Sequence, residues 1–214
     1  MKKFLVLALL FALPLVAYLF FASGVHNFGK LPVLTEKIAP LDDFSDLNGN
    51  SVQFQDKITI LGFFGSQVPE MHGHAFNLNW VIYKDYHEFY DFQFVILVEK
   101  GQEPQVKALK KEMAKTTDLD EWNFAFGSEM AINKVFQSLK TDLKLNVQNA
   151  TERVFIIDKN MALRGRDDDE EEEKVLFGYD TSSVAELKNK MVDDVKVILA
   201  EYRLKLKKYK KRKY

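Results

Sequence analysis

Short apolar runs alternate along the chain with stretches in which apolar residues recur every three or four positions. Residues 58–64 form a continuous apolar run, which is typical of a strand buried on both faces of a sheet. Residues 91–98, 122–126 and 153–158 predict three more strands, and the stretches between them predict helices. The resulting order, β-α-β-α-(β)-α-β-β-α, predicts an α/β domain with a mixed central sheet flanked by helices.

Three helices are predicted between these strands. The aromatic residues between Phe76 and Tyr90 recur at near-helical spacing and predict a mostly buried helix that follows a polar loop. Pro104 marks the start of the next helix, because proline is tolerated in a first turn. Ser128 is the expected N-cap of the third helix, whose apolar residues extend to Leu139.

The last helix has the clearest local pattern in the chain. Ser183 and Glu186 have the spacing of a capping box, and the apolar stripe behind them continues to Tyr209. Residues 203–214 form a basic tail without acidic residues, which leaves three alternatives: a solvated tail, a partner-binding helix, or a segment that lies on anionic lipid. Residues 167–173 are all acidic and predict an exposed loop.

The N-terminus has the pattern of a membrane segment. Lys2 and Lys3 precede an apolar run over residues 4–22, close to the roughly 20 residues that span a hydrocarbon core. We interpret residues 1–24 as an N-terminal transmembrane helix; the alternative is a signal cleaved near residues 22–24. By the positive-inside bias, the chain after this anchor is expected on the extracytoplasmic (periplasmic) side of a bacterial cytoplasmic membrane.

The segment after the anchor predicts a tether and then a folded domain. Residues 25–40 contain glycine and proline without a sustained period, so we interpret them as a linker. The domain is expected to cover residues 41–202. It should begin with a short hairpin over residues 43–54, because Asn48-Gly49 is a turn signal between alternating polar and apolar residues.

The composition and motif content of the chain exclude several classes of function for this protein. The 214 residues carry a net charge of -1, which excludes a nucleic-acid binder that relies on overall basicity. The chain has no cysteine, so it cannot form a disulfide or carry out dithiol exchange. It also lacks the Gly-x-Ser-x-Gly, phosphate-loop and His-Glu-x-x-His patterns. Nothing in the sequence therefore indicates an enzyme.

Several short motifs occur in the order of a known family. They are Asp43-Phe44, Asn48-Gly49, Phe63-Phe64-Gly65, the segment 149–160 and Leu163-Arg164-Gly165. Between Lys37 and Tyr202 the chain resembles the SCO/SenC group of thioredoxin-like proteins, which are membrane-anchored copper chaperones and thiol reductants that help to assemble cytochrome c oxidase. The resemblance implies a thioredoxin-like fold.

The functional motif of that family is altered in this chain. The family carries a Cys-Pro motif with a second cysteine after the strand that ends in Phe-Gly, and a distant histidine before the final hairpin. The matching positions here are Val68 and His72, on either side of Pro69, and Asn149. Cu(I) binding and thiol exchange both depend on soft thiolates, so the resemblance implies the scaffold without its redox chemistry.

Met71, His72 and His74 could supply a substitute metal site, because thioether and imidazole groups suit copper. A copper metallochaperone that uses these residues is therefore one hypothesis, and no other cofactor is predicted. The first hypothesis is a redox-inactive binding or assembly factor. In it, the loop from Ser66 to His74 contacts a protein partner at or near the membrane, and the link to respiratory oxidase maturation comes from the family resemblance.

Overall fold

The computed structural model describes residues 3, 10, 12–16, 30–169 and 174–211 of the chain. Its centre is a mixed sheet with the order β1-β6-β5-β2-β3-β4, and β9 pairs with β5 beside this path. The strands are β1 (Val33–Thr35), β2 (Ile58–Gly65), β3 (Phe92–Glu99), β4 (Trp122–Gly127), β5 (Thr151–Ile157), β6 (Leu163–Arg164) and β9 (Tyr179–Asp180). The predicted mixed sheet is confirmed.

The middle of the sheet is formed by the apolar runs. Strand β2 pairs in parallel with β3 and antiparallel with β5, and β3 pairs in parallel with β4. All residues of β2 are buried, and in β3 only the last residue, Glu99, is not. A strand that is covered on both faces is mostly apolar, which explains the continuous runs in the sequence, and the buried polar pair Thr59 and Gln93 is joined by a hydrogen bond of 2.9 Å.

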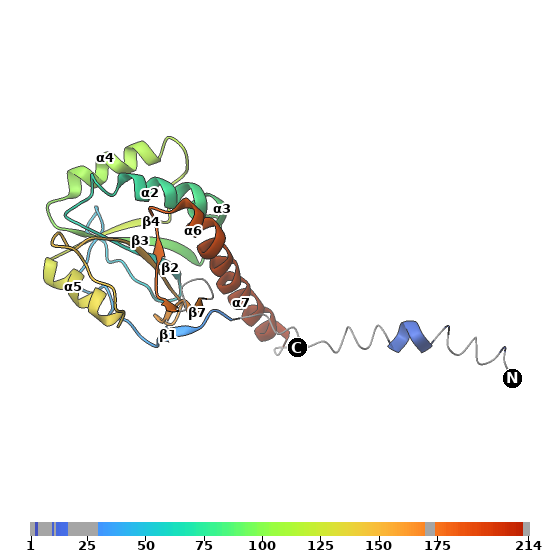
Figure 1. Cartoon of the computed structure of the whole chain (residues 1–214). Helices are drawn as coiled ribbons and strands as arrows, with labels where there is room; N and C mark the ends of the chain where they lie inside the picture. Colours follow the sequence, from blue (N-terminus) through green and yellow to red (C-terminus); the bar gives the residue numbers. More distant parts are fainter. Residues whose placement is uncertain (1–2, 4–9, 11, 17–29, 170–173, 212–214) are drawn as a thin grey trace.

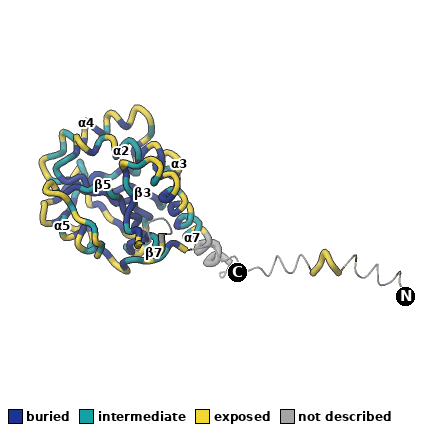
Figure 2. Tube along the Cα trace, viewed as in Figure 1, coloured by how far each residue is buried: buried dark blue, intermediate teal, exposed yellow. Residues whose placement is uncertain are grey.

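Helices cover both faces of the sheet (Figure 1). They are α2 (His72–Leu78), the π-helical turn η1 (Asn79–Tyr83), α3 (Lys84–Tyr86), α4 (Glu103–Met113), α5 (Glu129–Ser138), α6 (Val184–Glu186), the π-helical turn η2 (Leu187–Met191) and α7 (Val192–Lys211). Helices α2, α4 and α7 pack with one face of β2 and β3, whereas α5 packs with the other. The strands between these layers are the most buried part of the domain (Figure 2).

The predicted helix starts are confirmed with one change. Pro104 lies in the first turn of α4, and the Ser128 hydroxyl accepts a hydrogen bond from the Ala131 amide at 3.2 Å. Ser183 likewise caps α6 by accepting from the Glu186 amide at 3.1 Å. The capping box is incomplete, however, because the Glu186 carboxylate accepts from the Asp180 amide at 2.8 Å instead of from Ser183.

The predicted aromatic helix is corrected at its start and in its packing. It begins at His72, so His72 and His74 belong to α2 and not to a loop. Trp80 is 64% exposed and Tyr90 84% exposed, although the aromatic residues predict a mostly buried helix. Trp80 lies within the π turn η1, whose wider period departs from a regular 3.6-residue spacing, and Tyr90 lies beyond α3, which ends at Tyr86.

The expected linker is also corrected. Its described part, from Lys30, belongs to the domain: β1 pairs antiparallel with β6, and Leu31 and Ile38 are buried. The hairpin after it is reduced to a single antiparallel bridge between Ser45 and Ser51, with Gly49 at a φ of +84° in its turn.

The acidic segment is partly a strand. Strand β7 (Arg166–Asp169) pairs antiparallel with β8 (Lys174–Leu176), so the start of the predicted loop is one side of a two-stranded ribbon. Residues 170–173 lie outside the described residues. The basic tail is helical as far as Lys211, because α7 continues to that residue.

The predicted membrane anchor, residues 1–24, lies mostly outside the described residues. Within the part of the chain that the structure describes, no helix combines the length and the apolar character needed to cross a bilayer.

Candidate functional site

Two segments meet at the end of β2 and form the corner that the sequence singled out; we define the corner as residues 66–74 together with residues 146–149. The Ser66 amide donates to the Gln148 carbonyl at 3.0 Å, and the Asn146 side-chain amide donates to Gln67 Oε1 at 2.6 Å. Gly65 begins this contact at a φ of +50°, and a Cβ atom there would lie 1.9 Å from the Gln148 carbonyl oxygen. Only glycine allows so close an approach.

Val68, which the sequence resemblance matches to the first family cysteine, has a side chain that is part of the core. It has no exposed surface and packs in the same cluster as Phe64 and Met71. A backbone turn directs it inward, because the Met71 amide donates to the Gln67 carbonyl at 3.1 Å. The two methyl groups of Val68 are therefore out of contact with solvent.

The two histidines of the corner face different neighbours. His72 Nδ1 lies 3.9 Å from the Glu112 carboxylate of α4. His74 Nδ1 lies 2.8 Å from the Thr181 hydroxyl, and its Nε2 lies 3.9 Å from the Glu152 carboxylate. The ring of His74 thus joins α2 to the segment after β9, while His72 is directed toward α4.

The side chain of Met71 has different neighbours from those of the two histidines, because it is only 4% exposed and packs in the core. The structure therefore does not gather Met71, His72 and His74 into one set of ligands. Among the described residues, no group of three or more histidine, aspartate and glutamate side chains is placed to hold a metal ion.

Asn149, which the sequence resemblance matches to the distant family histidine, is a structural residue in this protein. It has a φ of +57° and is 6% exposed. Its Nδ2 donates to Glu99 Oε1 at 2.9 Å, and its Oδ1 accepts from Asn133 at 2.7 Å. The amide therefore joins the end of β3 to α5.

The three family positions do not fit a Cu(I) ion. Val68 offers no donor atom, the Asn149 amide is engaged by its neighbours, and His72 alone provides a ligand that copper prefers. A site with one ligand cannot hold copper tightly, so the family's copper chemistry has no counterpart at these positions.

The surface around the corner contains two exposed apolar side chains that the sequence analysis missed. Val147 is 90% exposed between Asn146 and Gln148, and Met130 is 82% exposed in the first turn of α5. Met130 could have been found, because it falls outside the apolar stripe of its helix. Val147 could not, because a single valine in a polar loop has no periodic pattern.

The comparisons with known proteins identify the fold. No protein-family model and no curated protein matches the chain. Among solved structures, BsSco, a member of the Sco family of cytochrome c oxidase assembly proteins, has a TM-score of 0.52 and 14% identity over 78% of this chain and 94% of its own. A candidate electron transport protein from Aquifex aeolicus has a TM-score of 0.53 and 16% identity over 77% and 96%, respectively.

A candidate protein disulfide isomerase from Bacteroides thetaiotaomicron has a TM-score of 0.52 and 14% identity, and the match covers 80% of this chain and 95% of that chain. The chain therefore has a thioredoxin-like fold, as predicted. The resemblance to the SCO/SenC group is confirmed as a likeness of fold, since BsSco is among its structural neighbours.

Proposed function

We propose that this protein is a redox-inactive, membrane-anchored binding or assembly factor that acts on the extracytoplasmic side of the membrane. The observation that carries the proposal is Val68, which is fully buried at the position where the family has its first cysteine, in a chain without any cysteine. The fold keeps the frame of a thiol site and fills its centre with apolar packing. Binding, and not electron transfer, is the function that this arrangement supports.

The surface of the corner supports a protein partner. The exposed side chains of Val147 and Pro69 lie among polar residues of the same two loops, and exposed Met130 is on the helix that contacts Asn149. Exposed apolar side chains with a polar surround are typical of the contact surfaces of proteins.

The partner that we propose is a subunit of a respiratory oxidase. The support is the fold shared with BsSco, whose family assembles cytochrome c oxidase. The apolar run over residues 4–22 supports a membrane anchor, which would hold the domain beside such a partner.

Site-specific photo-crosslinking in the full chain, within its native membrane, tests the contact surface. A photoreactive amino acid at Pro69 or Val147 should give covalent adducts with an oxidase subunit, identified by mass spectrometry. The matched control is the same amino acid at Lys196, which is exposed on α7. Both corner positions are already exposed, so the substitution should leave the fold intact.

Equal adducts from all three positions, or oxidase adducts from Lys196 alone, would show that the corner is not the contact surface. A second measurement uses Val147→Asp with Met130→Asp, which places charges on the proposed contact. Oxidase content, measured from haem absorbance of the membranes, should fall in this variant while the protein itself accumulates normally. Normal oxidase content would count against the proposal.

A further inference from the structure

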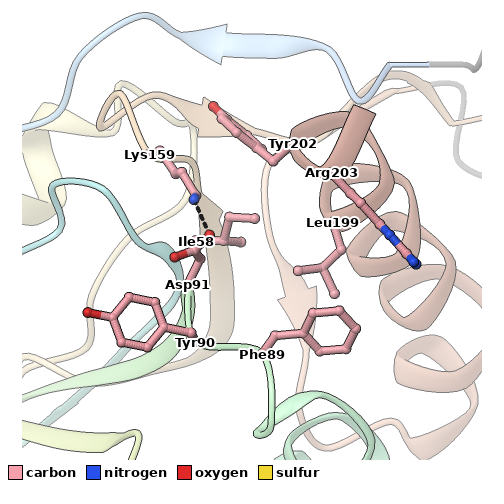
Figure 3. Close-up of a pocket in the computed structure, with 8 residues that line it drawn as sticks. All are labelled: Ile58, Phe89, Tyr90, Asp91, Lys159, Leu199, Tyr202 and Arg203. Atoms are coloured by element: carbon pink, nitrogen blue, oxygen red, sulfur yellow. Dashed lines mark hydrogen bonds and ion pairs between the residues drawn. The ribbon is translucent and has the colours of Figure 1, made fainter. Parts of the chain in front are cut away.

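A pocket of about 250 Å³ lies at the end of the domain where α7 leaves it (Figure 3). Phe89 and Tyr90 come from the turn before β3, whereas Leu199 and Tyr202 come from α7. Phe89 is 44% exposed and Tyr90 84% exposed. Figure 3 shows Arg203 on the α7 side of this pocket, with its guanidinium directed away from the rings of Tyr90 and Tyr202.

Lysine side chains accompany these aromatic rings. Lys57 Nζ lies 4.9 Å from the centre of the Tyr90 ring, and Lys159 Nζ lies 5.5 Å from that of Tyr202. The carboxylate of Asp91 in the pocket is held in an ion pair with Lys159 at 2.5 Å. Aromatic rings beside long cationic side chains are the combination that proteins place at a membrane interface, where rings lie at headgroup level and cations reach the phosphates.

The helix beside the pocket continues as a strongly basic segment. Residues 203–211 contain one arginine and five lysines with no acidic residue, and α7 is helical to Lys211. At 1.5 Å per residue this segment is about 13 Å long. The last acidic residue before it, Glu201, is held by Arg164 at 2.7 Å.

The start of the domain, at Leu31, is bound by the same arginine that binds Glu201 of α7. The guanidinium of Arg164 donates to the carboxylate of Glu201. Its Nε atom also donates a hydrogen bond of 2.8 Å to the carbonyl oxygen of Leu31. The chain therefore enters the domain beside the point where the basic part of α7 begins. From the end of the expected anchor at residue 24, the six residues 25–30 can reach at most about 21 Å. An anchored domain would thus keep this end close to the bilayer.

We propose that this end of the domain binds the surface of an anionic phospholipid bilayer. We name it the α7-end face, made of Phe89, Tyr90, Tyr202 and the helical residues 203–211. The aromatic rings enter the headgroup region and the lysines neutralise the lipid phosphates, because six cations without an acidic neighbour in sequence attract an anionic surface. The inference rests on the membrane anchoring in the proposed function.

The same orientation places the corner away from the lipid. Ile58 at the start of β2 lines the pocket, and Gly65 at the end of β2 begins the corner. A strand of this length spans about 23 Å. If the α7-end face lies on the membrane, the corner is presented to the part of a partner that stands outside the bilayer.

The absence of cysteine allows a direct test with single labels. The full chain carrying Tyr90→Cys or Val147→Cys is labelled with a fluorophore and assembled into lipid nanodiscs that contain headgroup quenchers. Both positions are strongly exposed, so neither substitution disturbs the core. We expect several-fold stronger quenching at position 90 than at position 147 in discs with phosphatidylglycerol, and loss of this difference in pure phosphatidylcholine or in high salt.

A charge variant and a matched control identify the cations. Five substitutions to glutamine in α7 remove its charges while keeping good helix formers, at Lys205, Lys207, Lys208, Lys210 and Lys211. The control removes five exposed lysines elsewhere, at Lys100, Lys107, Lys111, Lys115 and Lys144. Quenching at position 90 should be lost in the first variant and retained in the second.

Three outcomes would overturn the inference. Equal quenching at the two labelled positions, quenching independent of phosphatidylglycerol, or equal effects of the two lysine variants would each show that the α7-end face does not bind anionic lipid. A chain recovered outside the discs would show that the anchoring itself is wrong. The crosslinking result at the corner is obtained independently, so failure of the lipid contact and failure of the partner contact are distinguishable.

Discussion

Gly65 and Gly73 lie in the same segment of the corner but differ in what surrounds them. An alanine Cβ at position 65 would meet the Gln148 carbonyl oxygen and require a φ of +50°, whereas a Cβ at position 73 meets nothing within 4 Å. We expect Gly65→Ala to lower the free energy of unfolding by about 2–4 kcal/mol. Gly73→Ala should raise it by up to about 1 kcal/mol, because it removes a glycine from α2.

Urea unfolding of the two variants and the unchanged protein measures both effects. Both variants replace glycine with alanine. Opposite changes in their free energies of unfolding would therefore show that the loss at position 65 comes from the close contact with Gln148. A Gly65→Ala variant that unfolds at the same urea concentration as the unchanged protein would show that this contact does not fix the corner.

Tyr83 should make stability depend on alkaline pH. Burial raises the pKa of Tyr83 from its ordinary value of about 10 to about 12, although its hydroxyl accepts a hydrogen bond from the Glu121 amide. The unfolded chain loses this proton first, so the stabilisation is complete below pH 10 and is lost as the pH rises through about 12.

Tyr83→Phe removes this titrating group and tests the argument. The difference in unfolding free energy between the unchanged protein and the variant should be constant below pH 10 and then decrease toward pH 12. Urea titrations across this range measure it. A difference that stays constant to pH 12 would contradict the raised pKa. Tyr179, whose pKa burial also raises, is present in both proteins and cancels in the comparison.

At the scale of the elements, Arg164 joins segments that are far apart in sequence. Its guanidinium binds Asp158 at 2.9 Å and Glu201 at 2.7 Å, and it also contacts the Leu31 carbonyl, so it connects β6 with α7 and the start of the domain. Arg164→Met leaves two buried carboxylates without their cation, which should cost about 3–5 kcal/mol.

The matched control is Lys196→Met, which removes an exposed ion pair with Asp193 and should cost less than about 0.5 kcal/mol. The loss of stability in Arg164→Lys should lie between those of Arg164→Met and Lys196→Met, because one ammonium group cannot reproduce the planar donors of arginine. Denaturant unfolding ranks the three variants. If Arg164→Met and Lys196→Met were equally stable, the buried cluster would not hold α7 to the sheet.

The elements that sequence could predict are those determined by neighbouring residues. The strand at residues 58–64 and the cap at Ser128 depend on local patterns, and both are confirmed. Strand β1 was missed because it has three residues and its partner β6 is far along the chain, so no local period marks it. The π turn at η1 was missed because a regular helical period was assumed for the aromatic residues, and Trp80 within this turn is exposed.

In the candidate site, too, the sequence could predict local features but not those that depend on tertiary contacts. The family resemblance located Val68 and Asn149, but their roles come from tertiary contacts: Val68 packs in the core, and Asn149 bridges Glu99 and Asn133. Met71 and the histidines are adjacent in sequence, which suggested a shared ligand set. A helix directs neighbouring side chains to different sides, so adjacency alone did not bring them together.

At the scale of the whole molecule, the chain has a thioredoxin-like fold but no cysteine to supply thiol chemistry. The corner keeps the strand end at Gly65, the turn that holds Val68 and the loop that holds Asn149. A scaffold can be inherited without its activity when only a few side chains carry that activity. Restoring those side chains should therefore restore copper binding, whereas the unchanged protein should not bind copper stoichiometrically.

The variant is Val68→Cys with His72→Cys and Asn149→His, which supplies the three ligands of the family. Positions 68 and 72 are four residues apart, in the turn before α2 and at its first residue, and thiolates are the ligands that Cu(I) prefers. Anaerobic Cu(I) titration against a competing chelator should show one ion per chain for this variant. The thiolate-to-copper absorption would confirm the ligands.

The control is His72→Ala with His74→Ala in the otherwise unchanged protein, which should titrate as the unchanged protein does. The two imidazoles face Glu112 and Thr181 respectively, so removing them takes away no shared site. Tight one-to-one copper binding by the unchanged protein that this control abolishes would establish the metallochaperone in place of the proposed binding factor. A three-ligand variant that folds but binds no copper would show that the side chains at positions 68, 72 and 149 cannot reach a common metal ion in this fold.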